Sequence, residues 1–226
     1  MALILNIETA TKNCSVSIGN MGELIALEEL SDMGYSHAEK LHPFIQSVID
    51  KSGLSINDFD AIAVSKGPGS YTGLRIGVSA AKGLCFANNI PLIAVETLHS
   101  LATSIDIEEG YIVPMIDARR MEVYSAVYEK DYTKRRDIKA EIINEDSFKE
   151  LLINAKVHFL GDGSSKCKGV IQNNNAVFFE NKLPSSKSIV PISYDMFLSN
   201  SFEDVAYFEP FYLKDFIVTP SKKKLI

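Results

Sequence analysis

A glycine-rich stretch in the first half of the chain has the composition of a phosphate-binding loop. It reads KGPGSYTG over residues 66–73, between an apolar run and a segment with helical spacing. A strand, a glycine loop and a helix N-terminus together present unpaired backbone N–H groups and the positive end of a helix dipole. The residues that form this signature loop are Lys66, Gly67, Pro68, Gly69, Ser70, Tyr71, Thr72, Gly73 and Arg75.

The spacing within the signature loop does not match a known phosphate motif. Gly67-Pro68-Gly69 followed by Gly73 fits neither G-x-x-x-x-G-K-[ST] nor G-x-G-x-x-G, and Lys66 precedes the loop instead of following it. Anion binding therefore competes with a structural interpretation. In that interpretation the glycines supply positive φ angles and allow the helix to approach the sheet closely, and we favour it.

Two acidic residues stand where apolar strands end. Glu8 lies in IETAT (7–11) and Asp117 in IDAR (116–119). In a bilobal nucleotide-binding protein, such residues would face each other across a cleft and hold a metal through water. The alternative is a turn carboxylate that caps local N–H groups. His37 and His42 are five residues apart, which is off the i, i+4 spacing of a metal pair, so we expect exposed helix histidines and no metal site.

Composition limits the classes of function. The chain has 226 residues, 46% of them hydrophobic, and a formal net charge of −6, so it can bury a large core but lacks the positive surface of a nucleic-acid clamp. The basic runs at 134–136 and 222–224 are expected to be solvated loops and a frayed end. Three scattered cysteines, no signal peptide and no membrane span indicate a reducing cytoplasm.

Hydrophobic periodicity predicts alternating strands and helices. Strands are expected over 3–7, 14–18, 23–30, 61–64, 92–95, 111–116, 122–128 and 157–160, and helices over 36–51, 73–88, 96–104, 146–155 and 192–199. Ser36 is the expected N-cap of the first helix. The same opening occurs twice, as an apolar strand, an acidic turn and an alternating strand. We therefore expect an α/β architecture of two related lobes with mixed sheets and crossover helices, over 1–106 and 107–226.

The helix expected over 73–88 is apolar on two sides. Leu74, Val78, Ala81 and Cys85 line one face, and a second, smaller face reads Ile76, Ala80, Gly83 and Ala87. A helix with two apolar faces must be covered twice. Its own sheet can cover one face. The helix over 36–51 or a second protein can cover the other, and the pattern alone leaves both alternatives open.

Several of these segments together resemble the TsaB family, also called YeaZ. They are IETAT (7–11) with CSV (14–16), KGPGSYTGLRIG (66–77), IDAR (116–119) with EVY (122–124), and the closing EPFYL (209–213). The similarity is strong over about residues 3–128, and GPGSYTGLRIG is its most specific part. The resemblance implies an actin-like (sugar kinase/Hsp70-type) bilobal fold, in agreement with the duplicated openings.

The resemblance also implies a function and partners. The family belongs to the bacterial machinery that makes N6-threonylcarbamoyladenosine next to the anticodon of tRNAs reading codons that begin with A. A separate enzyme makes threonylcarbamoyl-adenylate, and TsaD, a paralogue with the same fold, transfers the threonylcarbamoyl group to tRNA. TsaB binds TsaD and supports the transfer, and TsaE, an ATPase, joins them.

By this resemblance, a heterodimer with TsaD would form through the helices over 36–51 and 73–88, and the isolated chain could form a homodimer. tRNA would be bound through the complex. The expected interface residues are Leu41, Ile45, Val48, Ile76, Ala80, Gly83 and Ala87.

The two turns that would hold nucleotide phosphates in this fold are degenerate here. Ala10 stands where glycine would serve, and the second turn reads DARR over 117–120, so Cβ atoms and a long arginine oppose close backbone approach to a phosphate. The turn residues concerned are Glu8, Thr9, Thr11, Asp117 and Arg119. We expect a subunit without activity alone and without its own cofactor, ATP and metal belonging to partner subunits. The alternative is an independent ATP-binding kinase-like enzyme or a metallopeptidase-like protein.

Overall fold

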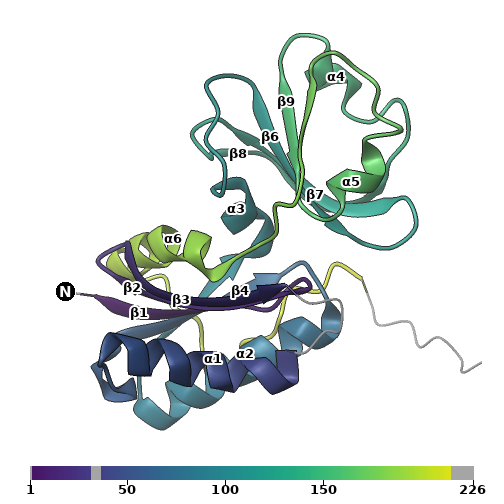
Figure 1. The fold of residues 1–226 in the computed structure, drawn as a ribbon. Coiled ribbons are helices and arrows are strands. Elements are labelled where there is room, and N and C mark those ends of the chain that lie inside the picture. The colour runs from purple at the N-terminus through teal and green to yellow at the C-terminus, as the bar shows by residue number, and fades with distance from the viewer. Residues whose placement is uncertain (1, 32–36, 215–226) are drawn as a thin grey trace, which may run out of the picture.

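Two five-stranded sheets with helices on their faces form the two lobes of the molecule (Figure 1). The structure is a computed structural model that describes residues 2–31 and 37–214. The expected N-cap Ser36 and the basic run at 222–224 lie outside the described residues. Within them, no helix combines the length and the apolar character needed to span a bilayer.

The first sheet has the strand order β3-β2-β1-β4-β5. Its strands are β1 (Leu3–Glu8), β2 (Asn13–Asn20), β3 (Glu23–Ser31), β4 (Ala61–Gly67) and β5 (Leu92–Glu96). The first three pair antiparallel, and β4 and β5 continue from β1 in parallel. The register places the carboxyl ends of β1 and β4 side by side, with Ile7 opposite Val64.

The second sheet repeats this topology, with the order β8-β7-β6-β9-β10. Its strands are β6 (Tyr111–Asp117), β7 (Glu122–Glu129), β8 (Lys134–Ile142), β9 (Val157–Leu160) and β10 (Ala176–Phe179). Again three antiparallel strands are followed by two parallel ones. The expected duplicated, bilobal α/β architecture is confirmed.

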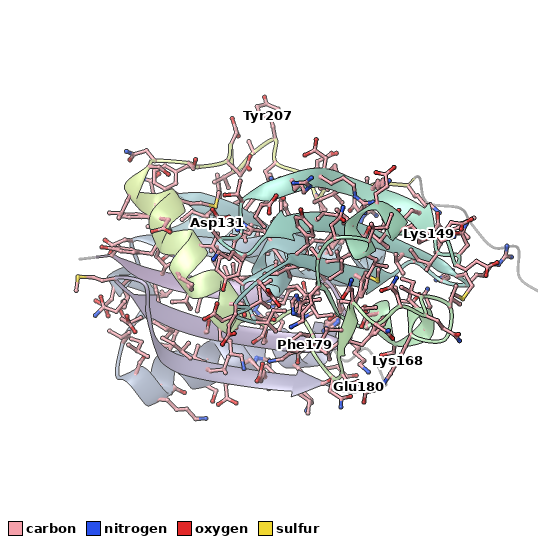
Figure 2. All side chains as sticks on the ribbon, turned by 90° about the horizontal axis from the view of Figure 1, so that it is seen from above. Asp131, Lys149, Lys168, Phe179, Glu180 and Tyr207 are labelled. Atoms are coloured by element: carbon pink, nitrogen blue, oxygen red, sulfur yellow. The ribbon has the colours of Figure 1, made fainter. Side chains whose placement is uncertain are left out.

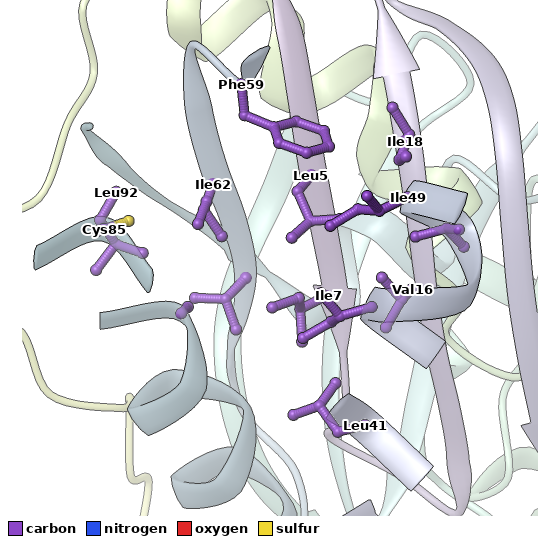
Figure 3. Close-up of a cluster of buried hydrophobic side chains, with 14 of the residues drawn as sticks. Leu5, Ile7, Val16, Ile18, Leu41, Ile49, Phe59, Ile62, Cys85 and Leu92 are labelled. Carbon is purple, nitrogen blue, oxygen red and sulfur yellow. The ribbon is translucent and has the colours of Figure 1, made fainter. Parts of the chain in front are cut away.

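Two long helices cover the outer face of the first sheet. They are α1 (His37–Ser52) and α2 (Tyr71–Asn88), and a short 3-10 turn, η1 (Ile56–Asp58), follows α1. The apolar stripe of α1 contains Leu41, Ile45, Val48 and Ile49, all buried against the strands. Figure 3 shows Leu41 and Ile49 of this stripe among the core side chains. The stripe recurs at intervals of three and four residues, so it predicted the helix correctly.

The other face of each sheet is covered by the helix that follows the last strand of the opposite sheet. Helix α3 (Thr97–Ala102) follows β5, yet its Leu98 and Leu101 pack with Ile112 and Ile116 of the second sheet. Helix α6 (Ser186–Leu198) follows β10 and lies on the first sheet (Figure 1).

Polar contacts fix α6 on the first sheet. Ser193 Oγ donates to Asn6 Oδ1 at 2.6 Å, and the backbone N–H of Ser186 donates to Ser15 Oγ at 2.8 Å. The packing therefore contradicts the predicted division into 1–106 and 107–226 at two places, the end of the first segment and the end of the second. Helix α3 belongs to the core of the second lobe, and the chain from α6 onward returns to the first.

The second lobe departs most from the expected elements. The helix expected over 146–155 is a single turn, α4 (Lys149–Leu152), and α5 (Ser164–Cys167) is equally short. The basic run at 134–136 lies in β8 and not in a loop. Strand β8 is an edge strand with mostly exposed or half-buried charged residues, so it carries no apolar alternation.

The packing of α6 gives a stability prediction. Ile189 is fully buried among Ile4, Ala63 and Ile93, so Ile189→Ala is expected to lower the free energy of unfolding by about 2–4 kcal/mol. Leu198→Ala, at the exposed end of the same helix, should change it by less than about 0.5 kcal/mol. Urea unfolding followed by circular dichroism measures both. Equal effects of the two changes would contradict the packing described for α6.

Candidate functional site

The signature loop packs directly against the turn between β1 and β2. The backbone N–H of Ser70 donates to Ala10 O at 2.6 Å, and Thr9 Oγ1 donates to Gly73 O at 2.8 Å. Ser70 is the N-cap of α2, where its hydroxyl accepts a hydrogen bond from the N–H of Gly73 at 3.3 Å. Two donors of the helix N-terminus thus already have partners within the chain.

The glycines of this region are required by close packing. A Cβ atom would lie 2.4 Å from Ala10 O at Gly69, 2.1 Å from Thr9 O at Gly73 and 2.2 Å from Thr9 Oγ1 at Gly77. Gly67 has a φ of +114°, and a Cβ there would lie 2.7 Å from Phe211 O. The structure therefore agrees with the structural interpretation of the signature loop, in which glycine allows the helix to approach the sheet.

Glu8 is fully buried beneath this contact. Its Oε1 accepts hydrogen bonds from the N–H of Ala10 at 2.6 Å and from Ser65 Oγ at 2.7 Å, while Oε2 has no partner among the described residues. Burial raises the pKa of Glu8 to about 7, against the opposing effect of these hydrogen bonds. A buried carboxyl that caps a local N–H corresponds to the second of our two interpretations of Glu8.

The expectation that both helix histidines are exposed is wrong for His37. Its side chain is buried, with Nε2 lying 2.7 Å from Thr11 O, and burial lowers its pKa. His42 is exposed, as expected. Sequence reasoning missed the role of His37 in holding the first turn. Its place at the start of α1, one turn before Leu41 of the buried stripe, was the available signal.

The second turn repeats the arrangement of the first. Asp117 Oδ1 accepts from the N–H of Arg119 at 2.8 Å, as Glu8 does from Ala10, and it also pairs with Lys166. Unlike Glu8, Asp117 is exposed. Arg119 and Arg120 adopt left-handed φ angles of 72° and 51°, which few non-glycine residues do.

A second glycine loop, GDG over 161–163, backs this turn. Asp162 Oδ1 accepts from the N–H of Asp117 at 3.0 Å, and a Cβ at Gly163 would lie 2.9 Å from the carbonyl carbon of Ile116. Burial raises the pKa of Asp162, and the charge of Lys12 from the first lobe opposes that effect. Sequence reasoning missed this loop. Its signal was its position after β9, the counterpart of β4, which precedes the signature loop.

No group of three or more His, Cys, Asp or Glu side chains suited to holding a metal occurs within 2–31 and 37–214. Thr9 and Thr11 are buried in the first turn. Of the signature loop, Pro68 is buried, Lys66 and Tyr71 are half-buried, and Thr72 is exposed.

The expected interface residues fall into two groups. Leu41, Ile45 and Val48 lie in the core of the first lobe, so assigning them to a partner surface was wrong. The buried stripe of α1 is the side that its own sheet covers. On α2, by contrast, Ile76 and Ala80 are half-buried, and Gly83 and Ala87 are exposed.

No residue within 2–31 or 37–214 covers the outer side of α2 at Gly83, where an added Cβ would find no atom of these residues within 4 Å. The neighbouring Phe86 side chain is 84% exposed. We call the surface formed by Ile76, Ala80, Gly83, Phe86 and Ala87 the α2 face. It is small and apolar, which permits close approach of another helix.

The closing segment EPFYL (209–213) packs against the signature loop and the start of α2. The N–H of Phe211 donates to Lys66 O at 2.7 Å, and Arg75 lies over the ring of Tyr71 and donates through Nε to the Tyr212 hydroxyl at 3.2 Å. Two residues before this segment, Tyr207 projects from the edge of the molecule (Figure 2) and is 84% exposed.

The state of Glu8 predicts a pH dependence of stability. Its pKa of about 7 in the folded protein exceeds the ordinary 4.5, so the folded state holds the proton more tightly. The stabilisation is complete below pH 4.5 and is lost as the pH rises through 7. Between pH 5 and pH 8 the wild type should lose about 2–3 kcal/mol of its free energy of unfolding through this group. Glu8→Gln lacks the titrating carboxyl and should not show that loss. Urea unfolding at both pH values measures it, with the exposed Glu23→Gln as control. A difference from wild type that does not change with pH would contradict a buried, protonated Glu8.

Comparisons with known proteins agree with the sequence motifs and the fold. A family model described as "TsaD: tRNA N6-adenosine threonylcarbamoyltransferase" matches residues 32–220. The tRNA threonylcarbamoyladenosine biosynthesis protein TsaB of Escherichia coli K12 is 31% identical over 223 residues, which cover 94% of each chain. TsaB of Haemophilus influenzae is 36% identical over 54% of this chain and 51% of its own.

The solved structure of YeaZ from Pseudomonas aeruginosa superposes with a TM-score of 0.81 at 25% identity, over 94% of this chain and 100% of that one. The duplicated lobes described above are thus shared along nearly the whole chain. Together with the identity to a curated relative over almost its full length, this similarity shows that the chain belongs to the TsaB (YeaZ) family of tRNA threonylcarbamoyladenosine biosynthesis proteins.

Proposed function

We propose that this chain is a non-catalytic subunit for the threonylcarbamoylation of the adenosine next to the anticodon, in tRNAs that read codons beginning with A. It binds TsaD and, together with TsaE, supports the transfer that TsaD catalyses. One observation carries the proposal: the α2 face is apolar and exposed at Gly83, Phe86 and Ala87, while the turns of a nucleotide site contact the chain's own loops. The family membership supports the same role.

The α2 face supports protein binding by its chemistry. Gly83 and Ala87 leave the helix backbone accessible, and the exposed Phe86 ring adds apolar area at the edge. A contiguous apolar surface of this kind on a globular protein marks an interaction site. Burying Phe86 fully would contribute about 1.5–3 kcal/mol to association.

The similarity to the TsaD family model supports a partner of the same fold. Two proteins that share a fold can present equivalent helix faces to each other about a two-fold axis, as identical subunits do in an isologous dimer. The isolated chain would then use the α2 face for a weaker homodimer, which the heterodimer would replace.

The two turns support a subunit without its own nucleotide, so that ATP and metal belong to partner subunits. In the first turn the N–H of Ala10 donates to Glu8 Oε1, and in the second the N–H of Arg119 donates to Asp117 Oδ1. Backbone N–H groups placed in this way are poorly available to phosphates. The net charge of −6 favours binding of tRNA through the partners. The free thiols of Cys14, Cys85 and Cys167 favour a reducing cytoplasm.

A charged side chain on the α2 face should prevent TsaD binding. Gly83→Arg is expected to weaken the affinity at least tenfold, because the long side chain occupies the space where a partner helix would pack. Gly169→Arg is the matched control, since Gly169 also has no atom within 4 Å of an added Cβ but lies in the second lobe. Isothermal titration calorimetry with TsaD measures both variants, and light scattering gives the mass of the complex. Equal affinities for the two variants, or separate monomers of wild type and TsaD at micromolar concentration, would refute the proposed interface.

The isolated chain is expected to show no tight binding of Mg-ATP by calorimetry, because both turns lack the open backbone that phosphates require. Asp117→Ala serves as the diagnostic variant. A dissociation constant in the low micromolar range that this substitution abolishes would instead favour the alternative, an independent ATP-binding enzyme.

A further inference from the structure

A cavity of about 360 Å³ lies between the two lobes. This volume is within the range of about 300–1,000 Å³ that small-molecule sites occupy. Its walls come from strands β4, β5, β7 and β8, from helices α3 and α6, and from the turn after β7. The lining residues are Lys66, Ala94, Val95, Glu96, His99, Tyr128, Tyr132, Lys134, Ile192 and Met196.

The cavity is separate from the two turns discussed above. No residue of 8–11, 117–120 or 161–163 is among those that line it. It therefore lies outside the place where phosphates would sit between the two turns, and it is not the α2 face. Both lobes contribute to it, with Lys66 and Glu96 from the first and Tyr128 and Lys134 from the second.

The charges around the cavity are unbalanced. Lys134 Nζ pairs with Glu96 Oε2 at 2.6 Å across the two lobes, which leaves this pair neutral. Lys66 is half-buried, and its ammonium group has no hydrogen bond or ion pair with any residue that the structure describes. Burial lowers the pKa of His99, so the imidazole adds no charge near neutral pH. Lys66 is thus the one charged lining residue without a partner among the described residues, while burial and the charges of Glu96 and Asp137 raise the pKa of Tyr128 in the same wall.

An aromatic residue with a buried, unpartnered hydroxyl lines the same cavity. The Tyr128 hydroxyl has no hydrogen-bond partner in the described part of the chain, although the side chain is only 1% exposed. Its ring stacks on His99, with centroids 5.6 Å apart. An unsatisfied buried hydroxyl is uncommon in a native protein. The oxygen itself has almost no accessible surface, so Tyr128 presents its ring and not its hydroxyl to the cavity.

The remaining wall is apolar. Ala94 and Val95 are buried at the end of β5, and Ile192 and Met196 lie one turn apart on α6. A mostly apolar wall with a few polar groups is typical of small-molecule sites. Such a wall favours a compact apolar body over a second charged group.

We propose that this interlobe cavity binds a small organic molecule with one oxyanion group, a carboxylate or a phosphate ester, on a compact apolar body. The oxyanion pairs with Lys66, and the body packs against Ile192 and Met196. The site differs from the proposed TsaD interface and does not depend on it.

Methyl resonances of methionine test the proposal in the full chain. Met196 lies in the cavity wall, and Met21, 51% exposed in the hairpin turn between β2 and β3, is an internal reference. Sodium benzoate and phenyl phosphate are the probes for the two oxyanions, and benzamide is the neutral counterpart of benzoate. We expect a saturable shift of Met196 with at least one oxyanion, and at least tenfold weaker binding of benzamide.

Substitutions assign the binding to the cavity. Lys66→Met should weaken binding of the oxyanion probe at least tenfold, whereas Lys187→Met, which removes an exposed lysine of α6, should leave it unchanged. If Lys66→Met does not fold by circular dichroism, Lys66→Gln replaces it. The absence of a Met196 shift with either oxyanion, equal binding of benzoate and benzamide, or undiminished affinity in the Lys66 variant would overturn the proposal.

Discussion

Close backbone packing between the β1–β2 turn and the start of α2 is the constraint on which the first lobe depends. Gly69, Gly73 and Gly77 bring the helix so near the turn that a single added carbon at any of them would lie within 2.4 Å of a turn oxygen. This contact occupies the carbonyl of Ala10 and the hydroxyl of Thr9. The contact therefore fixes the N-terminus of α2 on the turn, and the opposite side of that helix is exposed at Gly83 and Ala87.

The two lobes share one strand order but use it differently. In the first lobe, long helices α1 and α2 cover the outer face of the sheet, whereas the second has only the single turns α4 and α5 there. The glycine loops after β4 and β9 pack behind equivalent turns, and Glu8 and Asp117 cap them in the same way. The two lobes thus share the turn geometry, but among the described residues long helices cover only the outer face of the first sheet, and the α2 face lies on one of them.

Sequence predicted the fold well where one apolar face is buried and regular. The strands from 3 to 128 and the helices α1 and α2 were found because their apolar residues recur at the period of the element. Strand β8 was missed because it is an edge strand rich in charge.

The site was only half predictable. The spacing of the glycines favoured the structural interpretation of the signature loop, with which its packing agrees. The burial of Leu41, Ile45 and Val48, however, depends on which side of α1 meets the sheet, and the cavity at Lys66 depends on how the lobes join. Neither of these tertiary relations can be predicted from the spacing of residues along the sequence.

The exchange of α3 and α6 between the lobes constrains the order in which the protein can form during synthesis. The first sheet emerges early, but the helix that covers its inner face ends at Leu198, near the end of the chain. Until then Ile4, Ala61 and Ile93 have no partner on that side. The nascent first lobe therefore exposes the apolar inner face of its sheet while the second lobe is translated. Transiently exposed apolar surface of this kind is prone to aggregation and is bound by chaperones. Completion of the first lobe is one of the last events of folding.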